Sequence, residues 1–441
     1  MSDTPSSALQ IKPLLYQSHQ TPFTEWVTLL TLCLAPLIAH IVAGVPRTSP
    51  LCSHRPKWHQ YLCHFNPTSI LWRYAAITDR RIRANTWDRA DLAAANTLFW
   101  TAQGWDGSEA MVSESLTFCS HLPEHGRVSL ASREMVKTVI VTLQGVQASI
   151  LLTGVLTNVY GADFPVWLGV DAIFFPLAFI GLLRLTCGFW LTDDYAYSAP
   201  RIQDYQDPLR RGLAEAALSL DSLHEAPSTL RARGDEPRSD PYRKPSFWLA
   251  RAFRAVYLLP IIGVWIITIL YLRQALQLTT TAFLTLLFHF VLLGATAVIC
   301  AFYFARDRTT STVIPCISAR WYQAYSALLG VFMLALFVVA CVETRRTACG
   351  KYTSGPPYTG EINACRVGGM DLVVLGEEGR ILAENPDIPL DAVGFGITTS
   401  AGGAVTPPGS FLVYNFTGTC LGSVLLSSGR RISPPPGRQQ Q

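Results

Sequence analysis

Long runs of apolar residues alternate with polar segments along this chain. Six runs reach the roughly 18 apolar residues that a helix needs to cross a bilayer. They cover residues 26–45, 136–156, 166–191, 255–272, 282–304 and 325–342. Because a soluble protein would have to bury every one of these helices, the pattern predicts an all-α integral membrane helical bundle with about six transmembrane helices.

The polar segments between these runs differ in character. Residues 46–135 are rich in aromatic and basic residues, and Trp72 and Tyr74 ahead of Arg80 predict a helix that lies along the membrane surface. Residues 88–101 predict a second amphipathic helix, because their apolar side chains recur at helical spacing. We therefore expect a folded segment between the first two membrane helices.

The remaining segments predict a short tail, a loop and a small domain. Residues 1–25 contain no clear cleavage site, so we interpret the first apolar run as a retained anchor. Residues 192–254 combine an amphipathic helix with a charged, proline-rich stretch that predicts partial disorder. Residues 343–429 hold short apolar runs between glycine-rich turns, which predict a small β-rich domain, and residues 430–441 predict a disordered tail.

Composition agrees with membrane insertion, and the charges indicate an orientation. The 441 residues are 49% hydrophobic and 15% charged, whereas soluble proteins average about 25% charged residues. Segments 46–135, 193–254 and 306–320 lie on one side of the membrane and together carry 23 Lys and Arg residues. The segments on the other side carry few basic residues near helix ends apart from Arg345 and Arg346. Because basic loops stay cytosolic, both termini are predicted to be exoplasmic.

Two features of the C-terminal region fit an exoplasmic location. Asn415 begins an Asn-Phe-Thr acceptor for N-linked glycan, whereas the proline in Asn66-Pro67-Thr68 excludes that site. Cys349, Cys365 and Cys420 are disulfide candidates, because disulfides persist in an oxidising compartment. The pairing stays open, since the number of cysteines is odd.

Polar residues inside the predicted helices are the candidate functional site, because each is costly to place in lipid. Asp171 and Arg184 lie near opposite ends of the third run, where Arg184 is expected to extend to the headgroups. His289 is the deepest candidate for proton coupling or substrate binding. Contacts between helices are the alternative role for this set, which comprises His40, Gln144, Gln147, Asp171, Arg184 and His289.

Residues 52–64 contain the weak metal candidates Cys52, His54, His59 and Cys63. Their spacing matches no zinc module, so we expect no metal and no cofactor. The chain contains no Gly-rich phosphate loop, no Gly-x-Ser-x-Gly and no His-Glu-x-x-His. No enzyme class and no nucleic-acid partner is therefore indicated.

The stretch WRYAAITDRRIRANTWDRADLAAANTLFW, followed further on by TVIVTLQGVQA, resembles uncharacterised multi-pass membrane proteins of filamentous fungi. The resemblance covers about residues 67–154. It implies a eukaryotic secretory-pathway or plasma membrane, and no known activity accompanies it.

Two functional hypotheses follow from the sequence. The first is a non-enzymatic membrane component that lies in the lipid bilayer and presents segment 46–135 and the C-terminal ectodomain to protein partners. The second is a transporter or channel, which requires His289, His40, Gln144 and Gln147 to line a shared cavity.

Overall fold

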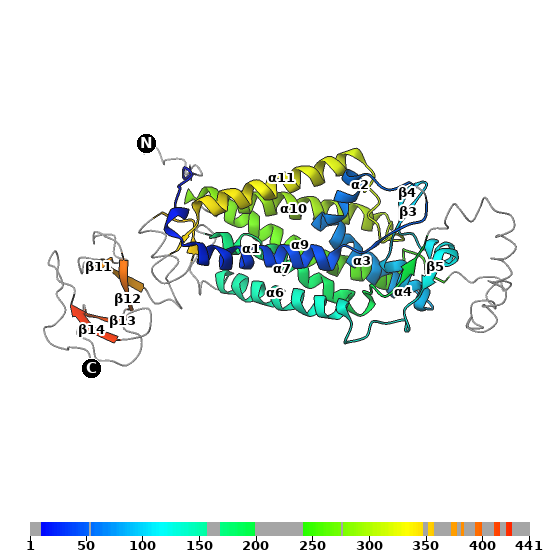
Figure 1. Cartoon of the computed structure of the whole chain (residues 1–441), viewed down its shortest axis with the longest axis horizontal. Coiled ribbons are helices and arrows are strands. Elements are labelled where there is room, and N and C mark those ends of the chain that lie inside the picture. Colours follow the sequence, from blue (N-terminus) through cyan, green and yellow to red (C-terminus); the bar gives the residue numbers. More distant parts are fainter. Residues whose placement is uncertain are drawn as a thin grey trace, which may run out of the picture.

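The structure is a computed structural model of the chain, and most of it is helical. It describes residues 10–52, 54–156, 168–198, 241–274, 277–346 and 352–356, together with five short strands beyond residue 371. The long helices lie side by side as one bundle (Figure 1).

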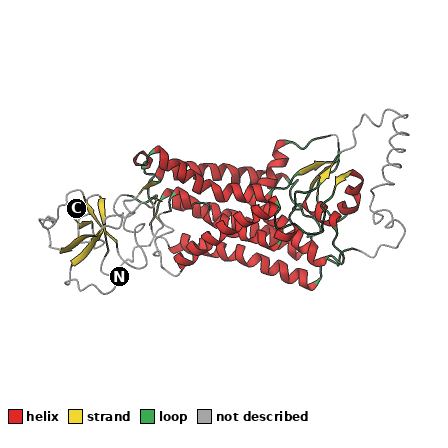
Figure 2. Ribbon diagram, turned by 60° about the horizontal axis from the view of Figure 1, so that its bottom comes forward, coloured by secondary structure: helices red, strands yellow, loops and turns green. Residues whose placement is uncertain are grey.

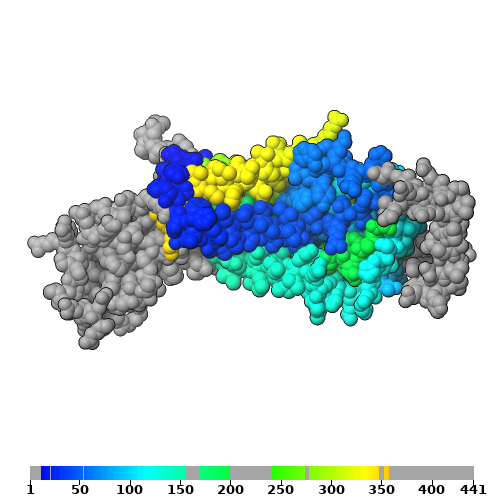
Figure 3. Space-filling model, in the orientation of Figure 1, coloured from blue at the N-terminus to red at the C-terminus, as the bar shows by residue number. Residues whose placement is uncertain are grey.

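In the part of the chain that the structure describes, five helices are long and apolar enough to cross a membrane. They are α1 (Phe23–Gly44), α6 (Arg133–Leu156), α9 (Trp248–Gln274), α10 (Thr280–Ala305) and α11 (Arg320–Glu343). Their outward faces carry exposed apolar side chains such as Val42, Leu143, Leu259, Val298 and Leu334. Figure 3 shows α1 between α6 and α11 on one side wall of the bundle. Because water would not tolerate so large an apolar wall, the chain is a multi-pass integral membrane protein in contact with lipid.

The third predicted span, residues 166–191, is not one regular helix. The described part forms η5 (Val170–Ala172), α7 (Phe175–Gly181), η6 (Leu182–Thr186) and η7 (Gly188–Trp190). Pro176 lies in the first turn of α7, where its missing N–H costs nothing, and this position prevents the helix from continuing backwards. The segment still runs along the bundle. Near its start the Val170 N–H donates to Thr344 Oγ1 at 2.9 Å, and at its end Asn96 Nδ2 donates to the carbonyl oxygen of Trp190 at 2.7 Å.

The segments before α1 and after α11 lie at the same end of the bundle, which we call the terminal end. The side-chain amide of Gln17 donates to the carbonyl oxygens of Glu343 and Ser354 at 3.1 and 3.2 Å. β1 (Gln10–Ile11) pairs in parallel with β7 (Gln277–Leu278), and β8 (Arg345–Arg346) pairs with β9 (Tyr352–Thr353). The α9–α10 connection therefore lies at this end too.

The opposite end carries a folded cap, defined as residues 45–132, 188–198, 241–247 and 306–319. Its short helices are α2 (Trp58–Leu62), η2 (Cys63–Phe65), α4 (Arg89–Asn96), α5 (Met111–Glu114) and η3 (Ser115–Phe118). One sheet has the order β2 (Thr48–Pro50), β3 (Leu98–Thr101) and β4 (Gly104–Asp106), and a second pairs β5 (Cys119–His121) with β6 (Ala196–Tyr197). Figure 2 shows these strands beside the helix ends.

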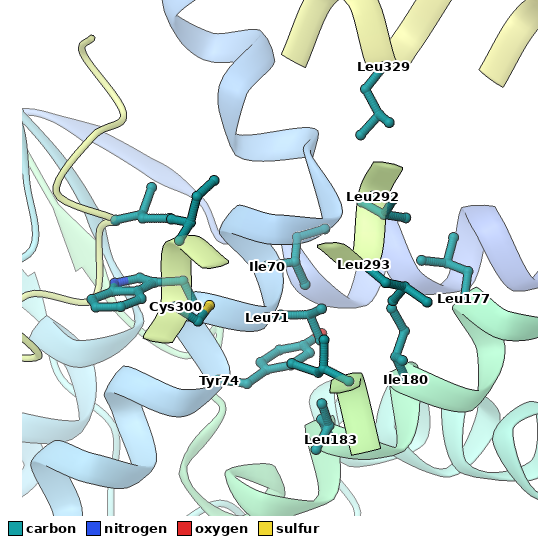
Figure 4. Close-up of a cluster of buried hydrophobic side chains, with 14 of the residues drawn as sticks. Ile70, Leu71, Tyr74, Leu177, Ile180, Leu183, Leu292, Leu293, Cys300 and Leu329 are labelled. Carbon is teal, nitrogen blue, oxygen red and sulfur yellow. The ribbon is translucent and has the colours of Figure 1, made fainter. Parts of the chain in front are cut away.

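The longest cap helix, α3 (Pro67–Arg83), is a buried element of the bundle and does not lie along the membrane surface. Every residue from Pro67 to Arg80 is buried, and α3 packs against α1, α9, α10 and η6. Figure 4 shows Leu71 and Tyr74 beside Leu293 of α10 and Leu183 of η6. The surface-helix prediction was wrong because the polar side chains of α3 find partners on segments distant in sequence.

Beyond residue 371 the described backbone forms a five-stranded antiparallel sheet. Its order is β11 (Ile381–Leu382), β10 (Leu372–Gly376), β12 (Val393–Thr398), β13 (Ser410–Tyr414) and β14 (Cys420–Leu425). The strands fall within the region where the sequence predicts a β-rich domain. Asn415, Cys349, Cys365 and the side chain of Cys420 lie outside what the structure describes, and the cysteines whose side chains are described form no disulfide.

Candidate functional site

His289, on the first half of α10, is a buried titratable group of the membrane helices. Its side chain is buried, and Nδ1 lies 2.9 Å from the carbonyl oxygen of Thr285, one turn earlier. Because a carbonyl only accepts, Nδ1 carries the hydrogen in this contact. Nε2 has no hydrogen-bond partner within the described part of the chain.

His289 lines a cavity of about 110 Å³ between α6, α7, α9 and α10. Its walls come from apolar residues of these four helices and of the segment that ends with η5, with Thr268, Tyr271 and Thr285 as further polar members. The apolar lining includes Ala148, Leu152, Ala172, Phe175, Phe179, Val264 and Leu286. The cavity lies toward the terminal end, because His289 follows the start of α10 by about 14 Å.

The other predicted members of this site do not join His289. His40 of α1 is buried beside Gly181 of α7: its Nδ1 lies 3.8 Å from the position that a Cβ on this glycine would occupy. Neither ring nitrogen of His40 has a hydrogen-bond partner among the described residues. Gln147 is exposed on α6 and Gln144 is half-buried. None of these three residues lines the cavity, so the structure does not assemble the four-residue polar site that transport would require.

Arg184 is buried inside the bundle, which contradicts the prediction that it extends to the headgroups. Its side chain is 1% exposed, and Nη2 lies 2.7 Å from Glu134 Oε2 at the start of α6. It also donates to Thr138 Oγ1 at 2.9 Å and to the carbonyl oxygen of Ala43. The guanidinium therefore joins α1, α6 and η6, and it stays inside because a carboxylate is available there.

Asp171 lies in η5 at the terminal end, far along the segment from Arg184. Its side chain is half-buried, and Oδ1 has no partner in the described ranges. A Cβ on Gly169 would lie 2.6 Å from this oxygen, so glycine leaves room for the carboxylate to turn back toward the backbone. Asp171 and Arg184 form no pair, as their separation in sequence predicted.

The cysteines and histidines of residues 52–63 do not converge on one point. The Cys52 thiol donates to the carbonyl oxygen of His54, and the Cys63 thiol donates to that of His59. Among the described residues, no three His, Cys, Asp or Glu side chains form a group that could hold a metal. The neighbouring His64 packs edge-on against Trp105 with ring centroids 4.3 Å apart, and burial lowers the pKa of His64 to about 3.

A charge network that the sequence reasoning missed surrounds the end of α3. Asp79 is fully buried and accepts from three elements: Arg83 Nε at 2.8 Å, Arg254 Nε at 2.7 Å and Thr309 Oγ1 at 2.7 Å. The two guanidinium groups come from α3 and α9, and the hydroxyl comes from the loop after α10. The four-residue spacing of Asp79 and Arg83 was the available signal, because such residues face each other on a helix.

The network extends outward through Asp307, which directly follows α10. Arg254 Nη1 lies 2.7 Å from Asp307 Oδ1, and Arg251 Nη2 lies 2.7 Å from Oδ2. The hydrogen bond from Arg251 and the charge of Arg254 hold the pKa of Asp307 below its ordinary value. On the other side, Arg83 also pairs with Glu109. Each of these charges has an opposite partner, so the network joins the cap to the membrane helices.

No protein-family model, no curated protein and no solved structure matches this chain.

Proposed function

We propose that this chain is a non-enzymatic membrane component that holds a folded cytosolic cap for protein partners and has both termini exoplasmic. The pairing of the internal charges supports this proposal most directly. Arg184 binds Glu134, and Asp79 binds Arg83 and Arg254, so these groups join segments of the protein instead of lining a path for ions. A buried pair that spans several elements fixes their relative positions.

The distribution of basic residues supports the orientation. Arg251, Arg306 and Arg320 lie where membrane helices meet the cap, whereas the exposed faces between the two ends are apolar. Arg306 also lies over the Phe302 ring, with 4.1 Å between its guanidinium carbon and the ring centroid. A basic and aromatic boundary is typical of the cytosolic interface of a secretory-pathway or plasma membrane.

The orientation is tested with cysteine labelling in intact cells. Cys52 and Cys119 are half-exposed on the cap. A membrane-impermeant maleimide should label them only after the membrane is permeabilised, and the Cys52→Ser/Cys119→Ser variant gives the background. Labelling of these two cysteines at an intact cell surface would contradict the proposed orientation.

Glycosylation gives an independent test of the same orientation. Glycosidase treatment should increase the electrophoretic mobility of the parent protein and leave the mobility of an Asn415→Gln variant unchanged. Equal mobility of the untreated parent and variant, together with protease access to the tail from the cytosol, would contradict an exoplasmic C-terminus.

The partner role is tested by a photoreactive amino acid at Gln103, which is exposed at the β3–β4 turn of the cap. A discrete protein adduct is expected there. The same amino acid at Ile266, exposed on the apolar face of α9, should yield no protein adduct. Absence of an adduct at Gln103 in living cells would contradict a partner on this face.

A further inference from the structure

We propose that the cavity beside His289 binds an uncharged lipid that carries a hydroxyl group, with that hydroxyl donating to His289 Nε2. This inference goes beyond the proposed partner role and does not depend on the orientation of the chain. Nε2 is the one ring nitrogen of His289 that has no hydrogen-bond partner among the described residues.

The hydrogen bonds of His289 define what the ligand must offer. Nδ1 donates to the Thr285 carbonyl oxygen, so a neutral ring presents Nε2 as an acceptor. A second proton would place a charge in an apolar cavity whose lining contains no carboxylate. The site therefore favours a ligand that donates a hydrogen bond.

The two threonines of the lining add to this preference. The Thr285 hydroxyl donates to the Thr281 carbonyl oxygen at 2.8 Å, and the Thr268 hydroxyl donates to the Val264 carbonyl oxygen at 2.9 Å. Both hydroxyl hydrogens are used within their own helices, which leaves only acceptor lone pairs for a ligand. Two hydroxyl acceptors, on α9 and α10, therefore line the cavity beside His289, and the Tyr271 hydroxyl of α9 can both donate and accept.

The walls select an apolar body for the same ligand. Phe175 and Phe179 from α7 and Leu152 from α6 are among the apolar lining residues. These three side chains are also partly exposed, so the cavity opens along the side of the bundle. Ile150 and Ile266, which are next in sequence to lining residues of α6 and α9, are exposed and face the lipid, which makes the bilayer the source of the ligand.

The volume indicates how much of the ligand enters. An apolar cavity of about 150 Å³ holds a benzene molecule. The 110 Å³ found here is smaller, so it fits the hydroxyl-bearing end of a lipid and not the whole molecule. The remainder of the molecule then stays among the bilayer chains.

Photoreactive lipids test this site on the full-length protein in membranes. The probes are a sterol with a free hydroxyl, a diacylglycerol, and a phosphatidylcholine that lacks a hydroxyl. We expect the sterol or the diacylglycerol, whichever is the bound class, to label peptides of α7 or α10, and phosphatidylcholine to label them at background. Equal labelling of these peptides by all three probes would overturn the proposal.

Variants separate the hydrogen bond from the shape of the cavity. His289→Leu should reduce labelling by about 5-fold, the loss expected for one neutral hydrogen bond. His40→Leu removes a buried histidine outside the cavity and should leave labelling unchanged. Ala148→Phe fills the cavity, keeps His289 in place and should abolish labelling by every probe.

The labelling of these variants can support the proposed lipid site or overturn it. Parent-level labelling of His289→Leu would overturn the proposal, and so would unchanged labelling of Ala148→Phe. If His289→Leu elutes as aggregate from a sizing column, the test rests on Ala148→Phe. Loss of labelling in Ala148→Phe then supports the site, and retained labelling overturns it.

Discussion

Arg184 Nη2 lies 2.7 Å from Glu134 Oε2, and both side chains are buried where α6 begins beside η6. Removing Arg184 leaves the buried Glu134 carboxylate with only the partly exposed Lys137 as a charged partner among the described residues. We expect Arg184→Met to lower the free energy of unfolding by about 3–5 kcal/mol. Denaturant titration in detergent micelles measures this loss.

The double variant Arg184→Met/Glu134→Met gives the control for this prediction. It removes both charges, so it should be more stable than Arg184→Met alone. Arg251→Met provides a matched surface comparison, because Arg251 is 58% exposed, and it should cost less than about 1 kcal/mol. Equal losses for Arg184 and Arg251 would contradict a structural role for the buried pair.

Asp79 should be the most sensitive residue of the cap network. Asp79→Asn removes the fully buried charge that Arg83 and Arg254 share, so we expect a loss of about 3–5 kcal/mol. Asp307→Asn is the matched variant. It should cost less, since Asp307 is 24% exposed and water can replace part of its interaction. The reverse order of the two losses in denaturant titrations would contradict the central place of Asp79.

Asp91 should make cap stability depend on pH. Burial raises the pKa of this carboxyl to about 6, and Tyr242 donates a hydrogen bond to it. Because the folded-state pKa lies above the unfolded value, the folded protein binds more protons between pH 4 and 6. The contribution of Asp91 to stability is therefore fully present below about pH 4 and is lost, by about 2–3 kcal/mol, as the pH rises to 6.

Melting temperatures recorded across this pH range test the Asp91 prediction. Asp91→Asn should remove this part of the pH dependence. Tyr242→Phe keeps the carboxyl but removes its hydrogen-bond donor, so the fall in stability should move to higher pH. A parent and an Asp91→Asn variant with parallel curves would refute the assignment.

Gly145 of α6 marks the closest approach to the interrupted segment. A Cβ there would lie 2.5 Å from Leu182 Cγ and 3.0 Å from the carbonyl oxygen of Ala178. Gly145→Ala should therefore destabilise the protein by about 1–3 kcal/mol through overpacking. Gly330→Ala on α11 meets nothing within 4 Å, and it should be neutral or stabilising by up to about 1 kcal/mol. Equal melting temperatures of the two variants would contradict this contact.

The sequence predicted the lipid-facing helices well, because their signal is local. The outer faces of α9 and α11 are apolar whatever they pack against, so length and composition identify both helices. The interruption near Pro176 escaped prediction, since a proline in the first turn of a new helix and one inside a continuous apolar run look alike.

The candidate site was predicted only in part, because its polar contacts join distant segments. His289 stood out by its depth, but the cavity beside it depends on α6, α7 and α9. The ion-pair partners of Arg184 and Asp79 on other helices could not be predicted for the same reason. The carboxylate of Glu134 lies 50 residues before Arg184, and Arg254 lies 175 residues after Asp79. Composition near either residue gives no sign of these partners.

The burial of α3 also imposes an order on biogenesis. Its Asp79 leaves the ribosome well before α9 and the loop after α10, which supply Arg254 and Thr309 to this carboxylate. Until then, Arg83 of the same helix is the only one of its three partners that has been synthesised. A nascent chain that stops before residue 248 would therefore leave this carboxylate with an incomplete set of partners, and the two halves of the protein reach the final packing of α3 only together.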